Sequence, residues 1–255
     1  MNLRHLLLAV AVAVVWGVNF VVIEVGLEDF PPLLFSALRF GLAAVPAIFV
    51  LGPPRMAWRY VVAVGLVLGV AKFGLLFVGM DRGMPAGLSS LVLQSQVVFT
   101  LLFAVLLLGE RPRRLQLVGV AVAASGIVLI AVDKGLTAPG PAFALVIAAA
   151  ACWGLSNTIT RHARPPDTLR FMVWVSAVAA VPLLLLSLLF EGPQADLHAL
   201  RTIDLTGVGA IAYLAGLATL FGFGAWGFLL RQYDASTVAP FSLLVPVVGM
   251  GTAWL

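Results

Sequence analysis

The chain has 255 residues, of which 62% are hydrophobic and only 10% are charged, and its mean hydropathy is +1.11. A soluble domain of this length has too little interior to bury so much apolar surface, so the composition excludes a soluble globular protein. The net charge of +4 comes from basic residues that stand singly between apolar runs, without the basic stripe that contacts phosphates, so nucleic acid is not expected as a partner.

Apolar runs follow one another along the whole chain. Crossing the hydrocarbon core of a bilayer takes about 20 apolar residues. The start, "MNLRHLLLAVAVAVVW", is interpreted as a retained first helix, because no small-residue cleavage site with polar sequence follows it. By this measure we predict nine spans, at 5–25, 32–51, 58–80, 86–108, 114–132, 140–160, 168–190, 205–230 and 236–255.

The joints between these runs are short and hold the Pro, Gly and charged residues, which leaves no room for a soluble domain. With the N-terminus inside, the inner segments hold ten basic residues, and the outer loops hold three basic and seven acidic ones. Because cytoplasmic loops carry the excess of Lys and Arg, the N-terminus is predicted to be cytoplasmic. The sequence therefore predicts an all-α polytopic membrane protein that is surrounded by the lipid bilayer.

Three short patterns recur in the same order. Trp16-Gly17 returns as Trp153-Gly154 at an offset of 137, and "AAVP" at 43–46 returns at 179–182. "AGLSSLVLQSQVV" (86–98) aligns loosely with "STVAPFSLLVPVV" (236–248). Units of five helices have opposite orientations because five is odd, so these patterns predict inverted repeats at 1–135 and 136–255, as in many secondary transporters. The second repeat ends within its fourth helix, so a tenth helix is expected and is missing from this sequence.

Several segments resemble the EamA branch of the drug/metabolite transporter superfamily, most closely its O-acetylserine/cysteine exporter type. They are "WGVNFVVIEVGLEDFPPLLFSALRF", "GMPAGLSSLVLQSQVVFT", "LGERP" and "VAPFSLLVPVVGM". The resemblance implies a ten-helix exporter in a bacterial inner membrane, built from two inverted EamA repeats, that moves small metabolites out of the cytoplasm.

Polar side chains inside the predicted spans share one depth. A charge at the bilayer centre costs about 2.5–3.5 kcal/mol on insertion scales, so such residues face protein or water and suggest a functional site. At about 1.5 Å per residue, Asn19, Arg39, Lys72 and Gln94 lie about 10–13 Å below the outer boundary, on four different helices. We interpret this level as the polar floor of a central substrate cavity, with Gln96 slightly deeper.

The charged members of this level have alternative roles. Arg39 either ties two helices together or binds a substrate carboxylate with its planar guanidinium. Lys72 either binds a substrate carboxylate, releases a proton during turnover, or bonds to carbonyl groups beside a water cavity. Glu24 is either a proton-coupling carboxylate or a side chain that reaches water or pairs with Arg39.

The walls of the cavity are predicted on two sides. Trp16 lies on the same side of the first helix as Asn19 and belongs to a stripe that suits a cavity wall. The residues expected to line the other half are Trp153, Asn157, Tyr213 and Trp226, although single aromatics in membrane helices often serve as packing or interface anchors. Pro240 and Pro246 are expected to break the ninth helix, because each lacks a backbone donor and such breaks occur where a cavity or a neighbour satisfies the carbonyls.

The leading functional hypothesis is a secondary active exporter of small zwitterionic metabolites, and the resemblance favours the cysteine-pathway compounds O-acetylserine and cysteine. A drug or toxic-compound efflux transporter of the same superfamily is the alternative. The chain has no Walker, GxSxG or HExxH motif, so an enzyme, a catalytic residue, a cofactor and a metal are not expected. The substrate is the expected small-molecule partner, and either a monomer or a homodimer fits the sequence.

Overall fold

The computed structural model describes residues 1–110, 139–233 and 235–254, with scattered single positions between 114 and 129. These residues are almost entirely helical, and none of them belongs to a strand. The fifth predicted span, 114–132, lies outside the continuously described ranges.

Seven helices among the described residues are long and apolar enough to cross a membrane, and they match seven of the predicted spans. The chain is therefore a multi-pass membrane protein. The spans are formed by α1 (Leu3–Asp29), α2 (Pro32–Leu51), α3 with η1 and α4 (Trp58–Asp81), α5 with η2 and α6 (Ala86–Leu108), α8 (Gly140–Ala163), α9 (Thr168–Phe190), and α11 with η3 and α12 (Leu205–Gln232).

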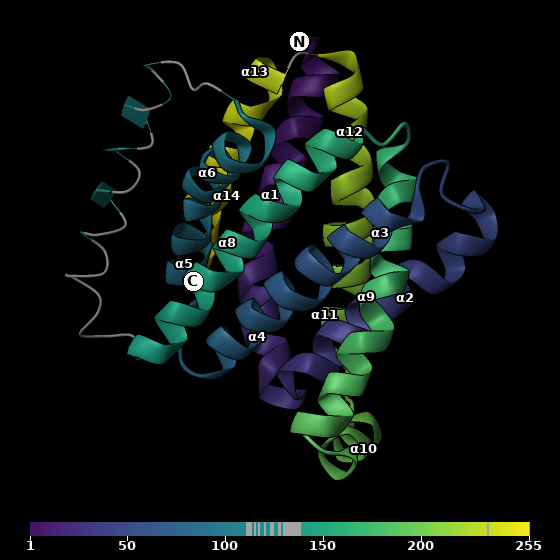
Figure 1. Ribbon diagram of the computed structural model, residues 1–255. Helices are drawn as coiled ribbons and strands as arrows, with labels where there is room; N and C mark the ends of the chain where they lie inside the picture. Colours follow the sequence, from purple (N-terminus) through teal and green to yellow (C-terminus); the bar gives the residue numbers. More distant parts are fainter. Residues whose placement is uncertain are drawn as a thin grey trace.

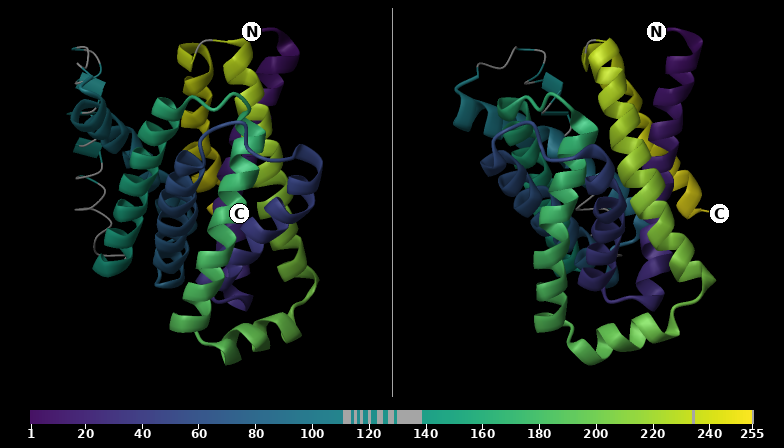
Figure 2. Two further views of the ribbon diagram at one scale, coloured as in Figure 1. Left: turned by 45° about the vertical axis from the view of Figure 1, so that its right-hand side comes forward. Right: turned by 90° about the vertical axis from the view of Figure 1, so that its right-hand side faces the viewer.

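The structure adds detail at two places near the C-terminal end of the sequence. The joint expected before the eighth span contains a ten-residue helix, α10 (Pro193–Thr202), which crosses one end of the bundle (Figures 1 and 2). The ninth run is divided into α13 (Ala235–Val238), η4 (Ala239–Leu243) and α14 (Leu244–Ala253). Pro240 lies in η4 and Pro246 lies in the first turn of α14, which follows η4 directly. Both prolines are therefore close to the change from 3₁₀ to α-helical geometry.

Irregular helical turns occur at corresponding places in the two halves of the chain. The third span runs from α3 (Trp58–Val64) through a π-helical stretch, η1 (Gly65–Lys72), into α4 (Phe73–Asp81). The eighth runs from α11 (Leu205–Ala212) through a second π-helical stretch, η3 (Tyr213–Phe221), into α12 (Gly222–Gln232). Tight 3₁₀ turns interrupt the fourth span at η2 (Leu93–Ser95), between α5 (Ala86–Val92) and α6 (Gln96–Leu108), and the last one at η4. Such interruptions are uncommon and often accompany functional sites.

Helix pairs also recur. α2 packs along α9, α1 packs on α14, and α8 packs on α6. The last two contacts depend on the glycines of the Trp-Gly patterns. A Cβ on Gly17 would lie 2.5 Å from the Cβ of Val248, and a Cβ on Gly154 would lie 2.7 Å from the backbone nitrogen of Thr100. Small residues permit such close helix approach in membranes.

The larger of two buried apolar clusters in the described part of the chain includes the rings of Phe35, Phe40, Phe77 and Phe171. Large apolar side chains on the outer surface of the helices, such as Phe49, Val50 and Leu189, are strongly exposed. In a membrane protein these outward side chains face lipid, and the bundle interior is left for the polar groups.

Candidate functional site

Arg39 lies in the middle of α2 and is only 2% exposed. Its Nε donates a hydrogen bond to Oγ1 of Thr219 in η3, at 3.1 Å. Its Nη1 is buried and has no hydrogen-bond partner. The guanidinium is thus fixed at one edge by the eighth span, while another edge keeps an unused donor.

Lys72 ends the π-helical stretch η1 and is 5% exposed. Its Nζ lies 3.3 Å from the ring centroid of Phe73 and 5.0 Å from that of Trp153. The Cζ of Arg39 lies 4.2 Å from the same Phe73 centroid. Arg39 and Lys72 therefore share one aromatic ring and form a buried cation pair.

The electrostatics of this pair are unbalanced. The π-faces of aromatic rings attract cations, by about 0.5–2 kcal/mol depending on how far the site is desolvated. That gain does not offset the cost of taking two like charges out of water and holding them together. Among the described residues, no carboxylate lies within ion-pair distance of Arg39 or Lys72. An anion that enters here would relieve the repulsion and could accept a hydrogen bond from Nη1 of Arg39.

Trp16 and Arg39 are both bonded to η3, at neighbouring residues. Its Nε1 donates to the carbonyl oxygen of Ala218 at 3.0 Å, and Ala218 precedes the Thr219 that binds Arg39. The Trp16 ring also packs against the rings of Phe223 and Trp226, with centroids 5.4 and 5.3 Å away. One π-helical stretch thus holds both the predicted aromatic wall and the guanidinium.

Asn19 is 7% exposed, and its Oδ1 is buried without a hydrogen-bond partner. An unpaired buried acceptor is costly, which makes it a candidate contact for a donor group of a substrate. Gln94 is half-buried in the 3₁₀ turn η2. Within the described part of the chain, no hydrogen bond or ring contact joins Gln94 to Arg39 or Lys72.

Gln96 and Asn157 come together at a second place, between α6 and α8. Nδ2 of Asn157 donates to Oε1 of Gln96 at 2.8 Å, and it also lies 3.3 Å from Oγ1 of Thr100. Oγ1 of Thr100 donates to the carbonyl oxygen of Gln96 at 2.7 Å. These amides satisfy one another, whereas Arg39 and Asn19 keep unused polar atoms.

Glu24 does not join the cation pair. Its side chain is exposed, and Oε1 accepts a hydrogen bond from the backbone nitrogen of Ala86 at 3.2 Å. This contact caps the N-terminus of α5, where a negative charge is favourable. Of the two structural alternatives for Glu24, the side chain that reaches the surface agrees with this placement, and pairing with Arg39 does not.

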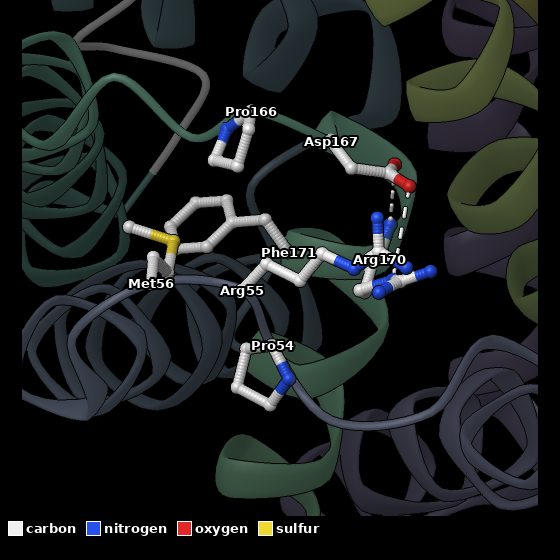
Figure 3. Close-up of a pocket in the computed structure, with 7 residues that line it drawn as sticks. All are labelled: Pro54, Arg55, Met56, Pro166, Asp167, Arg170 and Phe171. Atoms are coloured by element: carbon white, nitrogen blue, oxygen red, sulfur yellow. Dashed lines mark hydrogen bonds and ion pairs between the residues drawn. The ribbon is translucent and has the colours of Figure 1, made fainter.

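Two recesses are found elsewhere. One is a void of about 10 Å³ lined by residues that include Met56, Asp167, Arg170 and Phe171, and this volume holds at most one water. Figure 3 shows Met56 beside Phe171 and Asp167 beside Arg170. Asp167 accepts from the backbone nitrogen of Arg170 and caps α9. A more open recess of about 560 Å³ is lined by Leu107, Leu108, Glu110, Arg161, His162 and Arg164. Neither recess contains a residue that the sequence predicted for substrate binding.

The sequence prediction missed three partners of the site. Phe73 follows Lys72 directly, Thr219 is the only hydroxyl residue of η3 besides Tyr213, and Thr100 lies one turn after Gln96. The isolated Thr219 in an apolar run was a usable signal under the rule that polar groups in membrane spans face protein. Phe73 carried no such signal, because phenylalanine is ordinary in a membrane helix.

Comparisons with known proteins complete the description. The sequence profile of the EamA-like transporter family matches residues 3–132 and 140–255. A probable amino-acid metabolite efflux pump of Escherichia coli K12 is 41% identical over 262 residues, covering 100% of this chain and 87% of that protein. A protein of the same description from Salmonella typhimurium LT2 is 44% identical over 253 residues, covering 96% and 84%.

Two further matches are less similar in sequence. A probable terminal-alkyne amino-acid exporter of Streptantibioticus cattleyicolor is 28% identical over 255 residues, covering 96% of this chain and 83% of that protein. One solved crystal structure aligns with a TM-score of 0.52 at 19% identity, covering 100% of this chain and 99% of that one. At that identity the likeness shows the fold alone.

Proposed function

This chain belongs to the EamA-like transporter family, and we propose that it is a secondary active exporter of small metabolites that carry a carboxylate. Amino acids are the first candidate class, and the cysteine-pathway compounds O-acetylserine and cysteine are the first candidates within it. The family and the relatives above are transporters, not enzymes, and no chemical step is required of this chain.

The buried cation pair of Arg39 and Lys72 is the observation that carries this proposal. A substrate carboxylate supplies both the negative charge that the pair lacks and an acceptor for Nη1 of Arg39. The ammonium group of an amino acid is a donor that suits the unpaired Oδ1 of Asn19. Trp16 and Trp153 supply apolar surface for the remainder of the substrate. Gln94, Gln96 and Asn157 are proposed as peripheral residues of this site, which contribute to it from beside the cation pair.

The relatives support the substrate class at a coarser level. The Escherichia coli and Salmonella typhimurium proteins are named for amino-acid metabolites, and the Streptantibioticus cattleyicolor protein is named for an amino acid with a terminal alkyne. All three names describe molecules with a carboxylate beside an amine. The choice of cysteine-pathway compounds within that class comes from the resemblance of the sequence.

The proposed architecture consists of two inverted five-helix repeats, at 1–135 and 136–255, in a bacterial inner membrane with a cytoplasmic N-terminus. The family profile matches twice, once in each unit. The π-helical stretches η1 and η3 fall in the third and eighth spans, and close approaches at Gly17 and Gly154 follow corresponding tryptophans. These recurrences support the repeat, and the protein is proposed to act as a monomer or homodimer.

Lys72 is the stronger candidate for proton coupling, because it is buried beside Arg39, whereas Glu24 is exposed and caps a helix. If Glu24→Gln and Lys72→Gln both left proton-coupled export unchanged, neither residue would serve as the coupling group. Export driven by the substrate gradient would then account for transport.

Efflux of hydrophobic drugs is the second candidate, and one observation favours it. Trp16, Phe223 and Trp226 form a continuous aromatic cluster. Drug sites rely on such surfaces, but a drug cation would be repelled by Arg39 and Lys72. The carboxylate substrate is therefore preferred.

Uptake of labelled O-acetylserine and cysteine into inside-out vesicles tests the proposal. We expect saturable uptake by the wild type and at least tenfold less by Lys72→Gln, with a cationic drug failing to compete. Arg82→Gln, which removes an exposed cation, is the matched control and should keep wild-type uptake. Wild-type vesicles that take up neither compound but do take up a cationic drug would replace this proposal with the second candidate.

A further inference from the structure

The hydroxyl of Thr219 takes part in two hydrogen bonds of opposite sense. Thr219 lies in the π-helical stretch η3 and is only 1% exposed. Its Oγ1 donates to the carbonyl oxygen of Leu214 at 2.8 Å and accepts from Nε of Arg39 at 3.1 Å. A hydroxyl carries one hydrogen, so the bond to Leu214 leaves lone pairs for the guanidinium. The hydroxyl of Thr219 is therefore fixed as an acceptor for Arg39.

The π-helical geometry of η3 determines the direction of this hydroxyl. In the α-helical spans, the hydroxyls of Thr100, Thr158 and Ser176 each donate to the carbonyl oxygen four residues earlier. The hydroxyl of Thr219 instead donates to the carbonyl oxygen five residues earlier, which is the spacing of a π-helix. Because η3 packs against α2, the wider turn presents Oγ1 of Thr219 to Arg39.

The stretch η3 is itself held in place by α1. Nε1 of Trp16 in α1 donates to the carbonyl oxygen of Ala218 at 3.0 Å. Oη of Tyr213, the first residue of η3, donates to the carbonyl oxygen of Val15 in α1 at 2.8 Å. Thr219 follows Ala218 directly, so its hydroxyl belongs to a stretch that is bonded to α1 both at its start and in its second half. Support of this kind is what a group that orients another side chain requires.

The bond to Thr219 decides which edge of the Arg39 guanidinium is left for a ligand. A guanidinium binds a carboxylate with two parallel donors, which are either Nε with one Nη group or the two Nη groups. Nε is already bonded to Thr219, whereas Nη1 is buried without a partner. One face of the guanidinium is covered by the ring of Phe73, whose centroid lies 4.2 Å from Cζ. A carboxylate that takes two donors therefore binds at the edge formed by Nη1 and Nη2.

We propose that Thr219 is a positioning residue for substrate recognition, which turns Arg39 so that the edge of Nη1 and Nη2 receives the substrate carboxylate. This inference rests on the proposed exporter function. Without the hydroxyl, Nε would be a second buried donor that lacks an acceptor, which is costly. The guanidinium would then turn toward another acceptor, and its ligand edge would leave the orientation that suits a carboxylate. Thr219 thus acts on affinity for the carboxylate through Arg39.

Nuclear magnetic resonance of the full chain in detergent, labelled with ¹⁵N-arginine, tests the orienting bond without transport. The Nε–H resonance of Arg39 is identified by its absence from Arg39→Gln. We expect this resonance to shift upfield in Thr219→Val, which keeps the shape of the side chain and loses the acceptor. Thr219→Ser keeps the acceptor and should leave the resonance near its wild-type position. The same position in Thr219→Val as in the wild type would overturn the inference.

Uptake of labelled cysteine and labelled cysteinamide into inside-out vesicles tests recognition of the carboxylate, because the amide lacks that group. For Thr219→Val we expect KM for cysteine to rise about tenfold with kcat close to that of the wild type, as for a lost hydrogen bond to a charged group. The preference for cysteine over cysteinamide should fall by the same factor, and Thr219→Ser should restore both. An equal loss for the two compounds would show a merely structural role and would overturn the inference.

Thr252→Val is the matched control. It removes a hydroxyl from the apolar helix α14, where Oγ1 of Thr252 donates to the carbonyl oxygen of Val248 at 2.9 Å. We expect this variant to keep the wild-type KM and the wild-type resonance of Arg39. A rise in KM equal to that of Thr219→Val would overturn the inference. If wild-type vesicles take up neither compound, the proposed substrate class fails, while the resonance of Arg39 still decides whether Thr219 orients the guanidinium.

Discussion

Arg39 and Lys72 lie against the same ring, that of Phe73, and within the described part of the chain no carboxylate neutralises either of them. Arg39 belongs to α2 and Lys72 to the end of η1, so two like charges from two spans are held together at one ring. The repulsion lowers the free energy of unfolding, and it acts at the place where Nη1 of Arg39 has no hydrogen-bond partner. Such a cost at a functional site has testable consequences for stability as well as for transport.

Lys72→Gln should stabilise the detergent-solubilised protein while abolishing most export. The substitution removes a buried charge, whose desolvation in proteins costs several kcal/mol, and it also removes the repulsion with Arg39. Tryptophan fluorescence during heating should record a midpoint a few degrees above that of the wild type. A lower midpoint would mean that the contacts of Lys72 with the rings of Phe73 and Trp153 outweigh the cost of its buried charge.

Arg39→Lys should keep the charge but lose most of the transport. A lysine ends in a compact ammonium without the planar fork, so its N–H groups cannot reproduce the fixed directions in which the guanidinium bonds to Thr219 and presents Nη1. We expect at least a tenfold fall in kcat/KM for the labelled substrate, mainly through KM. Uptake kinetics in vesicles measure both terms, and unchanged kinetics would limit Arg39 to a general electrostatic role.

The burial of these cations could be predicted from sequence, but their partners could not. The high cost of a charge in lipid indicates that Arg39 and Lys72 face the protein interior, and both are buried. Thr219 and Phe73 meet Arg39 only through the packing of α2 against η3 and α4, which no local pattern records. The π-helical geometry of η1 and η3 is likewise a product of tertiary packing, since both sequences are ordinary apolar runs.

The helix α10 was not identified from the sequence, for a different reason. Its sequence begins at Gly192-Pro193 and carries several polar residues, which are signals for a loop between spans. Those same features also start a helix, because proline is favoured in the first turn. Only Asp196 and Ala199 of this helix are buried, so no apolar periodicity was available to identify it.

Asn157 and Gln96 should show a positive coupling energy in a double-mutant cycle. Each single change to alanine leaves the other amide with a lost partner between α6 and α8, and the double change removes both. Interhelical polar contacts in membranes contribute about 0.6–2 kcal/mol, so coupling of this order is expected in the free energy of unfolding. Denaturation of the four proteins in the same detergent supplies the measurement. Additive effects would show that the 2.8 Å contact contributes nothing.

Gly17→Ala and Gly154→Ala should each destabilise the fold, because their Cβ atoms have no room. The new atom would lie 2.5 Å from the Cβ of Val248 in the first case and 2.7 Å from the Cβ of Phe99 in the second. Overpacking of this kind costs about 1–3 kcal/mol, and here it would also separate α1 from α14 or α8 from α6. Thermal unfolding in detergent should record a lower midpoint for both variants.

Gly216→Ala is the matched control, since a Cβ at Gly216 meets no atom within 4 Å. If all three substitutions behaved alike, the losses would reflect helix propensity and not the close approach of the spans. A loss confined to Gly17 and Gly154 would instead identify the two Trp-Gly patterns as equivalent packing points of the two repeats.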